Sequence, residues 1–134
     1  MHKLNVALVE DHSALRDILV EYIGSLPQVE RCAAVKSAEQ ALESIPENAP
    51  DLMFIDLSLP GMSGIELIAL LRTRYPGLLC AILSGHKGRS YVRQAMAAGA
   101  NAYILKGDAG EIERGLDAML AGRTYVSQGV DGVR

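Results

Sequence analysis

The most informative stretch of this 134-residue sequence is LMFIDLSLPGMSG, residues 52–64. Its first part, Leu52 to Ile55, is a short apolar run of the kind that forms a strand buried on both faces. Asp56 begins a loop that contains proline and glycine, which interrupt regular structure. Apolar residues at three- and four-residue spacing then continue to about Arg74 and predict a helix. The stretch therefore indicates one strand–loop–helix unit.

The same unit recurs along the rest of the chain. Apolar runs predict strands at residues 4–9, 31–35, 52–55, 79–83 and 102–105. A helical pattern follows each strand. The first covers residues 13–25, and the second runs from 37 to the prolines at 46 and 50. The third follows residue 64 and runs to about 74, the fourth contains residues 92–96 and runs to 99, and the fifth covers about 111–121. Ile18 and Leu120 are among the residues expected on buried helix faces.

Five such units with nearly continuous apolar strands predict a parallel sheet with helices on both faces. We therefore expect a doubly wound α/β domain. Its five strands should follow the flavodoxin-like order 2-1-3-4-5, because parallel crossovers are right-handed. In this order the functional crevice lies at the carboxyl ends of the first and third strands.

Composition and charge describe one ordinary domain. The sequence is 49% hydrophobic and 22% charged, and its net charge is −3. This charge argues against direct binding to nucleic acid or to an anionic membrane, which would need clustered basic residues. No apolar run reaches a membrane-spanning length, and residues 1–3 lead into a strand rather than a signal peptide. We therefore expect a cytoplasmic protein with no membrane partner.

Polar side chains follow the predicted strands where each one ends. Glu10 and Asp11 follow the first strand, Asp56 the third, Ser84 the fourth and Lys106 the fifth. Taken singly, each is explained by the capping of a helix or turn. Because the predicted topology brings these strand ends to one edge, the five residues together indicate a shared site.

A cluster of carboxylates requires cations. Two carboxylates about 4 Å apart repel by about 4 kcal/mol at an effective dielectric constant of about 20, so three ionised ones need positive charge among them. Oxygen ligands without a nearby cysteine favour Mg²⁺, with Mn²⁺ as the alternative. A carboxylate held beside this ion and Lys106 is suited to attack a phosphoryl group, and Ser84 can donate to a phosphoryl oxygen.

These residues, together with the run from Asp56 to Gly64, resemble the receiver domain of bacterial two-component response regulators. The resemblance covers nearly the whole chain. Residues 10–16 and 98–106 look most like the branch of nitrate regulators and LuxR-type proteins, which usually carry a helix-turn-helix domain after the receiver. The resemblance implies a receiver at residues 1–123 and a tail, residues 124–134, that begins a flexible linker to an output domain outside this chain.

The resemblance also implies a role for each carboxylate. Asp56 matches the phosphoacceptor, which takes a phosphoryl group from a phosphohistidine on a sensor histidine kinase. Asp11, Asp56 and the backbone carbonyl of Ser58 match the Mg²⁺ ligands, and Glu10 matches a residue that reaches the ion through water. We expect no other enzymatic activity than this self-phosphoryl transfer and a slow autodephosphorylation.

Ser84 and Lys106 match the groups that bind the phosphoryl oxygens. Ser84 and Tyr103 match the pair that switches conformation, although a half-buried strand aromatic is an equal explanation for Tyr103. Phosphorylation would bias two packings of the domain and so control an output, implied to be transcription. The expected DNA contact then belongs to the output domain alone, and homodimer formation is left open.

Two residues depart from the common family pattern. Gly107 follows Lys106 where many receivers have proline, and Ser84 stands where many have threonine.

His12 is not expected to bind metal, because hard cations disfavour imidazole.

Three other functions compete with this one. An aspartate phosphatase is disfavoured because Ser58 stands where that class needs a second aspartate. A nucleotide or flavin binder is disfavoured because no glycine-rich loop follows the first strand. A receiver that acts by protein contact without phosphorylation stays open.

Overall fold

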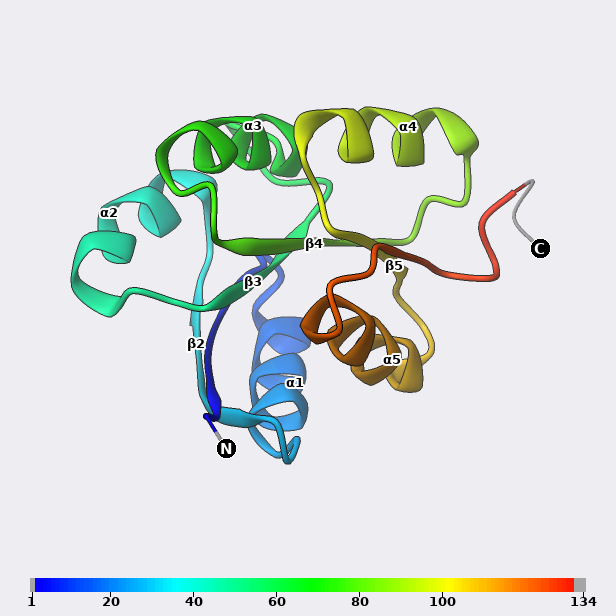
Figure 1. Ribbon diagram of the computed structural model, residues 1–134. Helices are drawn as coiled ribbons and strands as arrows, with labels where there is room; N and C mark the ends of the chain where they lie inside the picture. The colour runs from blue at the N-terminus through cyan, green and yellow to red at the C-terminus, as the bar shows by residue number, and fades with distance from the viewer. Residues whose placement is uncertain (1, 132–134) are drawn as a thin grey trace.

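A parallel sheet with helices on both faces forms the centre of the computed structural model, which describes residues 2–131 apart from the side chain of Asn48 (Figure 1). The strands lie in the order β2-β1-β3-β4-β5-β6, and every neighbouring pair is parallel. Their bounds are β1 (Leu4–Val9), β2 (Val29–Val35), β3 (Leu52–Asp56), β4 (Leu79–Ser84), β5 (Ala102–Leu105) and β6 (Tyr125–Val126).

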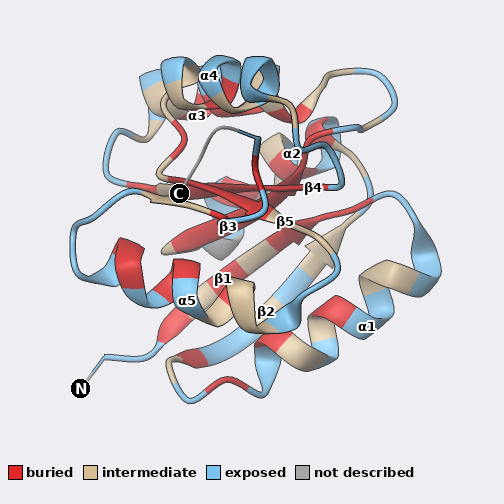
Figure 2. Ribbon diagram, turned by 90° about the vertical axis from the view of Figure 1, so that its right-hand side faces the viewer, coloured by how far each residue is buried: buried red, intermediate tan, exposed pale blue. Residues whose placement is uncertain are grey.

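Each face of the sheet has its own helices and its own apolar core. The helices are α1 (Ser13–Gly24), α2 (Ala38–Asn48), α3 (Gly64–Arg74), α4 (Arg89–Ala98) and α5 (Ala109–Leu120). Figure 1 shows α2, α3 and α4 on one face and α1 and α5 on the other, and two separate clusters of buried residues match this division. All residues of β3 are buried, which explains the unbroken apolar run in the sequence (Figure 2).

The expected doubly wound α/β fold is confirmed, but the expected number of strands is wrong. A sixth strand, β6, pairs with Ala102 and Tyr103 of β5. It contains only Tyr125 and Val126, so it is too short to produce the alternation by which a strand is recognised in a sequence. The other strand bounds differ from the expected ones by no more than a few residues.

Helix α2 passes through Pro46 and ends before Pro50, between the two prolines that were expected to close this unit. It continues to Asn48, and Ala49 follows in the left-handed region with φ 37°, its N–H donating to the Ile45 carbonyl over 2.8 Å. Proline lacks the N–H for one helical bond and its ring crowds the carbonyl four residues earlier, but the residues after Pro46 keep their own N–H groups and can complete the last turn.

Two apolar residues expected on buried helix faces are exposed instead. Ile18 of α1 keeps 65% of its surface accessible, and Leu120 of α5 keeps 45%. In both cases a neighbouring residue is buried instead: Leu19, which follows Ile18, and Met119, which precedes Leu120. A step of one residue turns the side chain by about 100° around a helix, which is enough to move it out of the core.

Residues 125–131, within the tail that was expected to begin a flexible linker, are docked on the sheet. Ser127 and Val130 are buried, with 1% and 3% of their surfaces accessible. The remaining tail residues, 132–134, lie outside the described residues.

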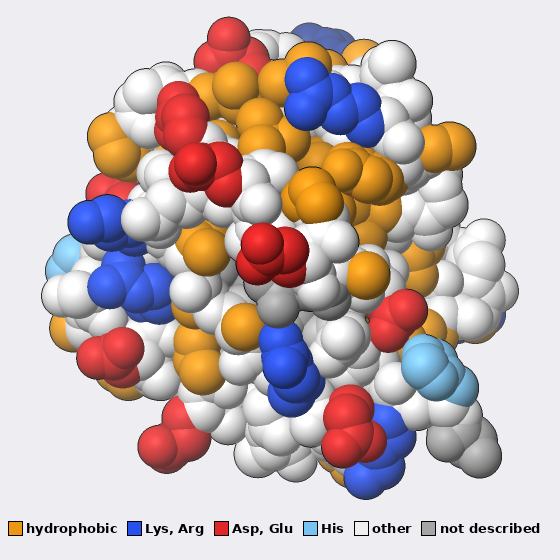
Figure 3. Space-filling view, turned by 90° about the vertical axis from the view of Figure 1, so that its left-hand side faces the viewer, with side chains coloured by type: hydrophobic (Ala, Val, Ile, Leu, Met, Phe, Trp, Pro, Cys, Tyr) orange, Lys and Arg blue, Asp and Glu red, His pale blue; other side chains and the backbone are white. Residues whose placement is uncertain are grey.

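The face around α2 and β2 carries charges of both signs. Figure 3 shows Lys and Arg interspersed with Asp and Glu there, beside a group of apolar side chains, and the described residues form no continuous basic patch on the face drawn. Within residues 2–131, no helix combines the length and the apolar character needed to cross a membrane.

Candidate functional site

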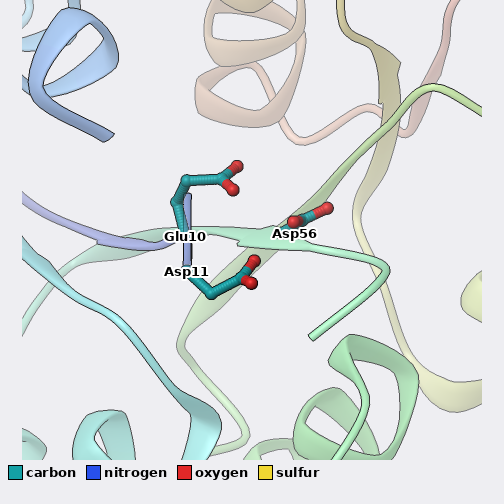
Figure 4. Close-up of side chains that lie close together, drawn as sticks. All are labelled: Glu10, Asp11 and Asp56. Atoms are coloured by element: carbon teal, nitrogen blue, oxygen red, sulfur yellow. The ribbon is translucent and has the colours of Figure 1, made fainter. Parts of the chain in front are cut away.

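Three carboxylates meet at the carboxyl edge of the sheet, as the sequence predicted. Glu10 and Asp11 come from the end of β1 and Asp56 from the end of β3, and in Figure 4 all three point to the same side. One oxygen of each lies within 4.8 Å of the others. Glu10 and Asp56 are buried, whereas Asp11 is exposed. Oxygen donors at this spacing fit a hard divalent cation such as Mg²⁺.

Strand register explains this meeting. Val9 of β1 pairs with Ile55 of β3, so the residues that follow each of them leave the sheet side by side. The backbone of Glu10 is held by donation of its N–H to the Val35 carbonyl over 3.1 Å. On the other side, Asp56 pairs with Leu83 of β4, which brings the next residue, Ser84, to the same edge.

The loop after Asp56 is fixed where it enters α3. Ser63 and Glu66 form a reciprocal cap at the start of that helix. The N–H of Gly64 donates to the Leu57 carbonyl over 3.2 Å. A Cβ on Gly64 would overlap the backbone oxygen of Asp56, so only glycine allows the helix to start this close to the strand end.

Lys106 joins the cluster from the end of β5. Its Nζ lies 3.0 Å from Glu10 Oε1 and 3.1 Å from Asp56 Oδ1. Its backbone N–H donates to the Ser84 carbonyl over 2.8 Å, which fixes the position of β5 relative to β4 at this edge. Burial opposes the charge on Lys106, but its hydrogen bonds and its attraction to Glu10 and Asp56 prevail and raise its pKa.

The pKa of Asp56 is raised mainly by burial. Lys106 counteracts this by attraction and by a hydrogen bond, while the negative charge of Glu10 adds to the rise. Asp56 Oδ1 also accepts a hydrogen bond from the backbone N–H of Ser58 over 3.3 Å. One ammonium group therefore does not fully offset the carboxylates, and a further cation would stabilise the ionised form.

Ser84 and Tyr103 both contact the loop between β4 and α4. Ser84 Oγ accepts a hydrogen bond from the His86 N–H over 2.9 Å, and Ser84 itself is buried. The Tyr103 hydroxyl donates to the His86 carbonyl over 2.8 Å. Tyr103 is fully buried rather than half-buried, so its ring lies inside the domain in this arrangement.

The sequence analysis did not single out Arg16. Its Nη1 donates to the Glu10 carbonyl over 2.9 Å and to the Asp11 carbonyl over 3.3 Å, and so holds the backbone that carries both carboxylates. Nothing in a single sequence distinguishes this arginine from an exposed helix residue. His12 caps α1 through Nδ1, which accepts from the Leu15 N–H, and it is absent from the carboxylate cluster.

Gly107, the first departure from the family pattern, adopts φ 110°. This is a conformation that glycine tolerates and proline cannot, since the proline ring fixes φ near −65°. The chain therefore turns differently after Lys106 than it would with proline, while the lysine still reaches both carboxylates.

Comparison with known proteins gives a consistent result. A sequence model described as the response regulator receiver domain matches residues 6–116. The DNA-binding transcriptional activator DevR/DosR of Mycobacterium tuberculosis is 34% identical over 124 residues, which are 92% of this chain and 57% of that protein. The transcriptional activator ExaE of Pseudomonas putida is 33% identical over 126 residues, 93% of this chain and 59% of that protein. The chain thus spans somewhat more than half the length of these relatives.

Solved structures show the same similarity. A LuxR-family two-component response regulator from Aurantimonas sp. superposes with a TM-score of 0.90 at 29% identity, covering 96% of this chain and 93% of that one. The signal receiver domain of the response regulator NarL from Mycobacterium tuberculosis superposes with a TM-score of 0.83 at 26% identity, covering 92% of this chain and 100% of that one.

Proposed function

The chain belongs to the response regulator receiver family, and from this membership we propose that Asp56 accepts a phosphoryl group from the phosphohistidine of a sensor kinase. The observation that carries the proposal is the position of its carboxylate. It is buried, 3.1 Å from the Lys106 ammonium and clustered with Glu10 and Asp11. A structural ion pair would need one carboxylate, whereas here two buried carboxylates contact a single lysine and a third, that of Asp11, lies beside them.

The carboxylates and a neighbouring carbonyl would hold Mg²⁺. Asp11, Asp56 and the backbone carbonyl of Ser58 supply direct ligands, and Glu10 acts through water. Asp11 is the exposed member, so the ion has access from solvent. When bound, Mg²⁺ offsets negative charge on the phosphoryl oxygens.

The transfer is a displacement at phosphorus. A carboxylate oxygen of Asp56 forms the new P–O bond while the P–N bond to the imidazole of the donor breaks. The imidazole leaves with the electron pair of the P–N bond, and it is neutral when its other ring nitrogen carries a proton. Lys106 and Ser84 stabilise the three phosphoryl oxygens, the first by its charge and the second by a hydrogen bond. Ser58, which is exposed, supplies no carboxylate to activate water, so hydrolysis of the product is slow.

The output is transcription control through a part of the protein that this chain does not include. Relatives named as DNA-binding or transcriptional activators match it over only part of their length. We therefore propose that DNA is bound by a further domain and that phosphorylation changes how the receiver contacts that domain, its kinase or a second copy. The alternative is a receiver that acts by protein contact without being phosphorylated, and it predicts that no phosphoryl group is taken up in the experiment below.

That experiment is intact-mass spectrometry after incubation with acetyl phosphate. We expect the mass of one phosphoryl group to appear only in the presence of Mg²⁺ and to disappear in Asp56→Asn. The matched control is Asp17→Asn, which removes an exposed carboxylate from α1 and should leave phosphorylation unchanged. Phosphorylation of Asp56→Asn to the wild-type extent would show that the phosphoacceptor is another residue.

A further inference from the structure

The strap, which we define as residues 125–131, lies along the free edge of β5. It begins with β6 and then turns toward the loop that precedes α4, as the red segment in Figure 1 shows. Val130 of the strap is buried in the same apolar cluster as Tyr103 and Ala95 of α4. Gly129 lies so close to β5 that a Cβ there would come within 2.8 Å of Leu105 Cδ1. The strap is thus packed as part of the domain.

Backbone hydrogen bonds join the strap to the strand that carries Tyr103. The Ser127 N–H donates to the Tyr103 carbonyl over 3.0 Å, and the Leu105 N–H donates to Ser127 Oγ over 2.9 Å. The Tyr125 N–H donates to the Asn101 carbonyl over 3.1 Å. These bonds use the outer edge of β5 along its whole length, up to the residue before Lys106.

Glu111 of α5 ties the strap down from the other side. Its carboxylate accepts a hydrogen bond from the Tyr125 hydroxyl over 2.5 Å. Partial burial opposes the charge on Glu111, but hydrogen bonds from Ser127, Tyr125 and Arg114 lower its pKa and keep it ionised. The ionised carboxylate of α5 therefore holds the start of the strap through the Tyr125 hydroxyl.

The far end of the strap holds the loop that contains His86 and Lys87. The Asp131 N–H donates to the Lys87 carbonyl over 2.8 Å. The next carbonyl back along the chain, that of His86, accepts from the Tyr103 hydroxyl, and the His86 N–H donates to Ser84 Oγ. The strap therefore contacts β5 and this loop at once, in the arrangement where Tyr103 is buried and Ser84 is held at the site edge.

We propose that the strap is a positioning element for phosphoryl binding, and that strap docking and phosphorylation of Asp56 stabilise each other. The proposal rests on the proposed function of Asp56 and adds a coupling that the site residues alone do not contain. Any group that fixes Ser84 and its loop favours the docked strap. Because coupling between two equilibria is reciprocal, a docked strap favours binding of that group equally.

The test combines two measurements on the whole 134-residue chain with Mg²⁺ and beryllofluoride, which mimics a phosphoryl group on aspartate. Amide hydrogen exchange at Leu105, Ser127 and Asp131 reports strap docking, and fluorine NMR reports beryllofluoride affinity. We expect beryllofluoride to slow exchange at these amides by about tenfold, the change that one or two hydrogen bonds produce. Asp56→Asn should abolish the slowing.

Strap variants test the reciprocal effect. Val130→Asp places a charge in the apolar cluster and should undock the strap, with about a tenfold loss of beryllofluoride affinity by the same reasoning. Gln128→Asp is the matched control, because it adds the same charge to an exposed position of the strap. Ser127→Ala, which leaves the Leu105 N–H without its acceptor, serves as a second variant if exchange in β1 and β3 shows that Val130→Asp is unfolded.

The outcomes separate the two proposals. Wild-type beryllofluoride affinity in a folded variant with rapid exchange at Leu105 and Ser127 would overturn the coupling and leave the function of Asp56 intact. Amide exchange at Leu105, Ser127 and Asp131 that stays unchanged when the wild-type protein is saturated with beryllofluoride would also overturn the coupling and leave the function of Asp56 intact. A wild-type chain that binds no beryllofluoride with Mg²⁺ would overturn both.

Discussion

Replacing Lys106 by methionine tests the charge balance of the site directly. The substitution keeps most of the side-chain volume but removes the ammonium that lies 3.0 Å from Glu10 and 3.1 Å from Asp56. The carboxylate side chains keep 1% and 7% of their surfaces accessible, so water replaces little of the lost charge. Removing one partner of a buried ion pair costs about 3–5 kcal/mol. Since the Lys106 side chain is 27% accessible, we expect the lower end, a loss of about 3 kcal/mol without Mg²⁺.

The assay is urea unfolding of wild type and Lys106→Met at several pH values, with and without Mg²⁺. The folded-state pKa of Asp56 is already raised, and loss of Lys106 raises it further. A carboxyl whose folded pKa exceeds its unfolded value destabilises the fold at neutral pH, and this penalty disappears as pH falls through the folded pKa. The stability gap between the two proteins should therefore narrow on acidification.

Added Mg²⁺ should narrow the same gap at neutral pH, because the ion replaces the missing positive charge and stabilises the folded state by mass action. Lys3→Met is the control, since it removes an exposed lysine that precedes β1, at the opposite end of the strand from Glu10. Equal stability of Lys106→Met and wild type without Mg²⁺ would refute the view that Lys106 compensates a buried excess of negative charge.

Three further outcomes are expected. Asp11→Asn should weaken Mg²⁺ binding by at least about tenfold in calorimetric titration, because it removes a charged ligand; unchanged affinity would exclude Asp11 from the ligand set. Gly64→Ala should lower the free energy of unfolding by about 1–3 kcal/mol, since the new Cβ overlaps the Asp56 backbone oxygen and must displace it; a wild-type urea midpoint would count against this close approach. Burial raises the pKa of both Cys32 and Cys80 to about 11, so neither should react with iodoacetamide at pH 8 until the chain unfolds; rapid labelling of the native protein would contradict this.

The sequence predicts those parts of the site that depend on topology alone. Once apolar runs identify the strands, the residues after β1, β3, β4 and β5 must come to one edge, and the carboxylates and Lys106 do so. Geometry inside the site is less accessible. The contact of Arg16 with two backbone carbonyls depends on side-chain direction, which residue spacing does not determine.

Tertiary packing accounts for the remaining differences. Leu120 and Ile18 match a helical apolar pattern, but the neighbouring residues occupy the core and leave these two in solvent. Strand β6 exists because the edge of β5 is available for pairing and because the Glu111 carboxylate accepts from the Tyr125 hydroxyl. Neither partner is next to the strap in the sequence. A polar segment such as residues 127–131 gives no local sign of such partners.

The pairing of β6 with β5 also bears on how this domain avoids association with other chains. An open strand edge presents unpaired N–H and C=O groups, which is the usual starting point for intermolecular sheet growth. Here the hydrogen-bonding groups of Asn101, Tyr103 and Leu105 are used within the chain. A chain cut after Arg123 would expose them together with the apolar surface that Val130 covers, and would be prone to aggregate through β5.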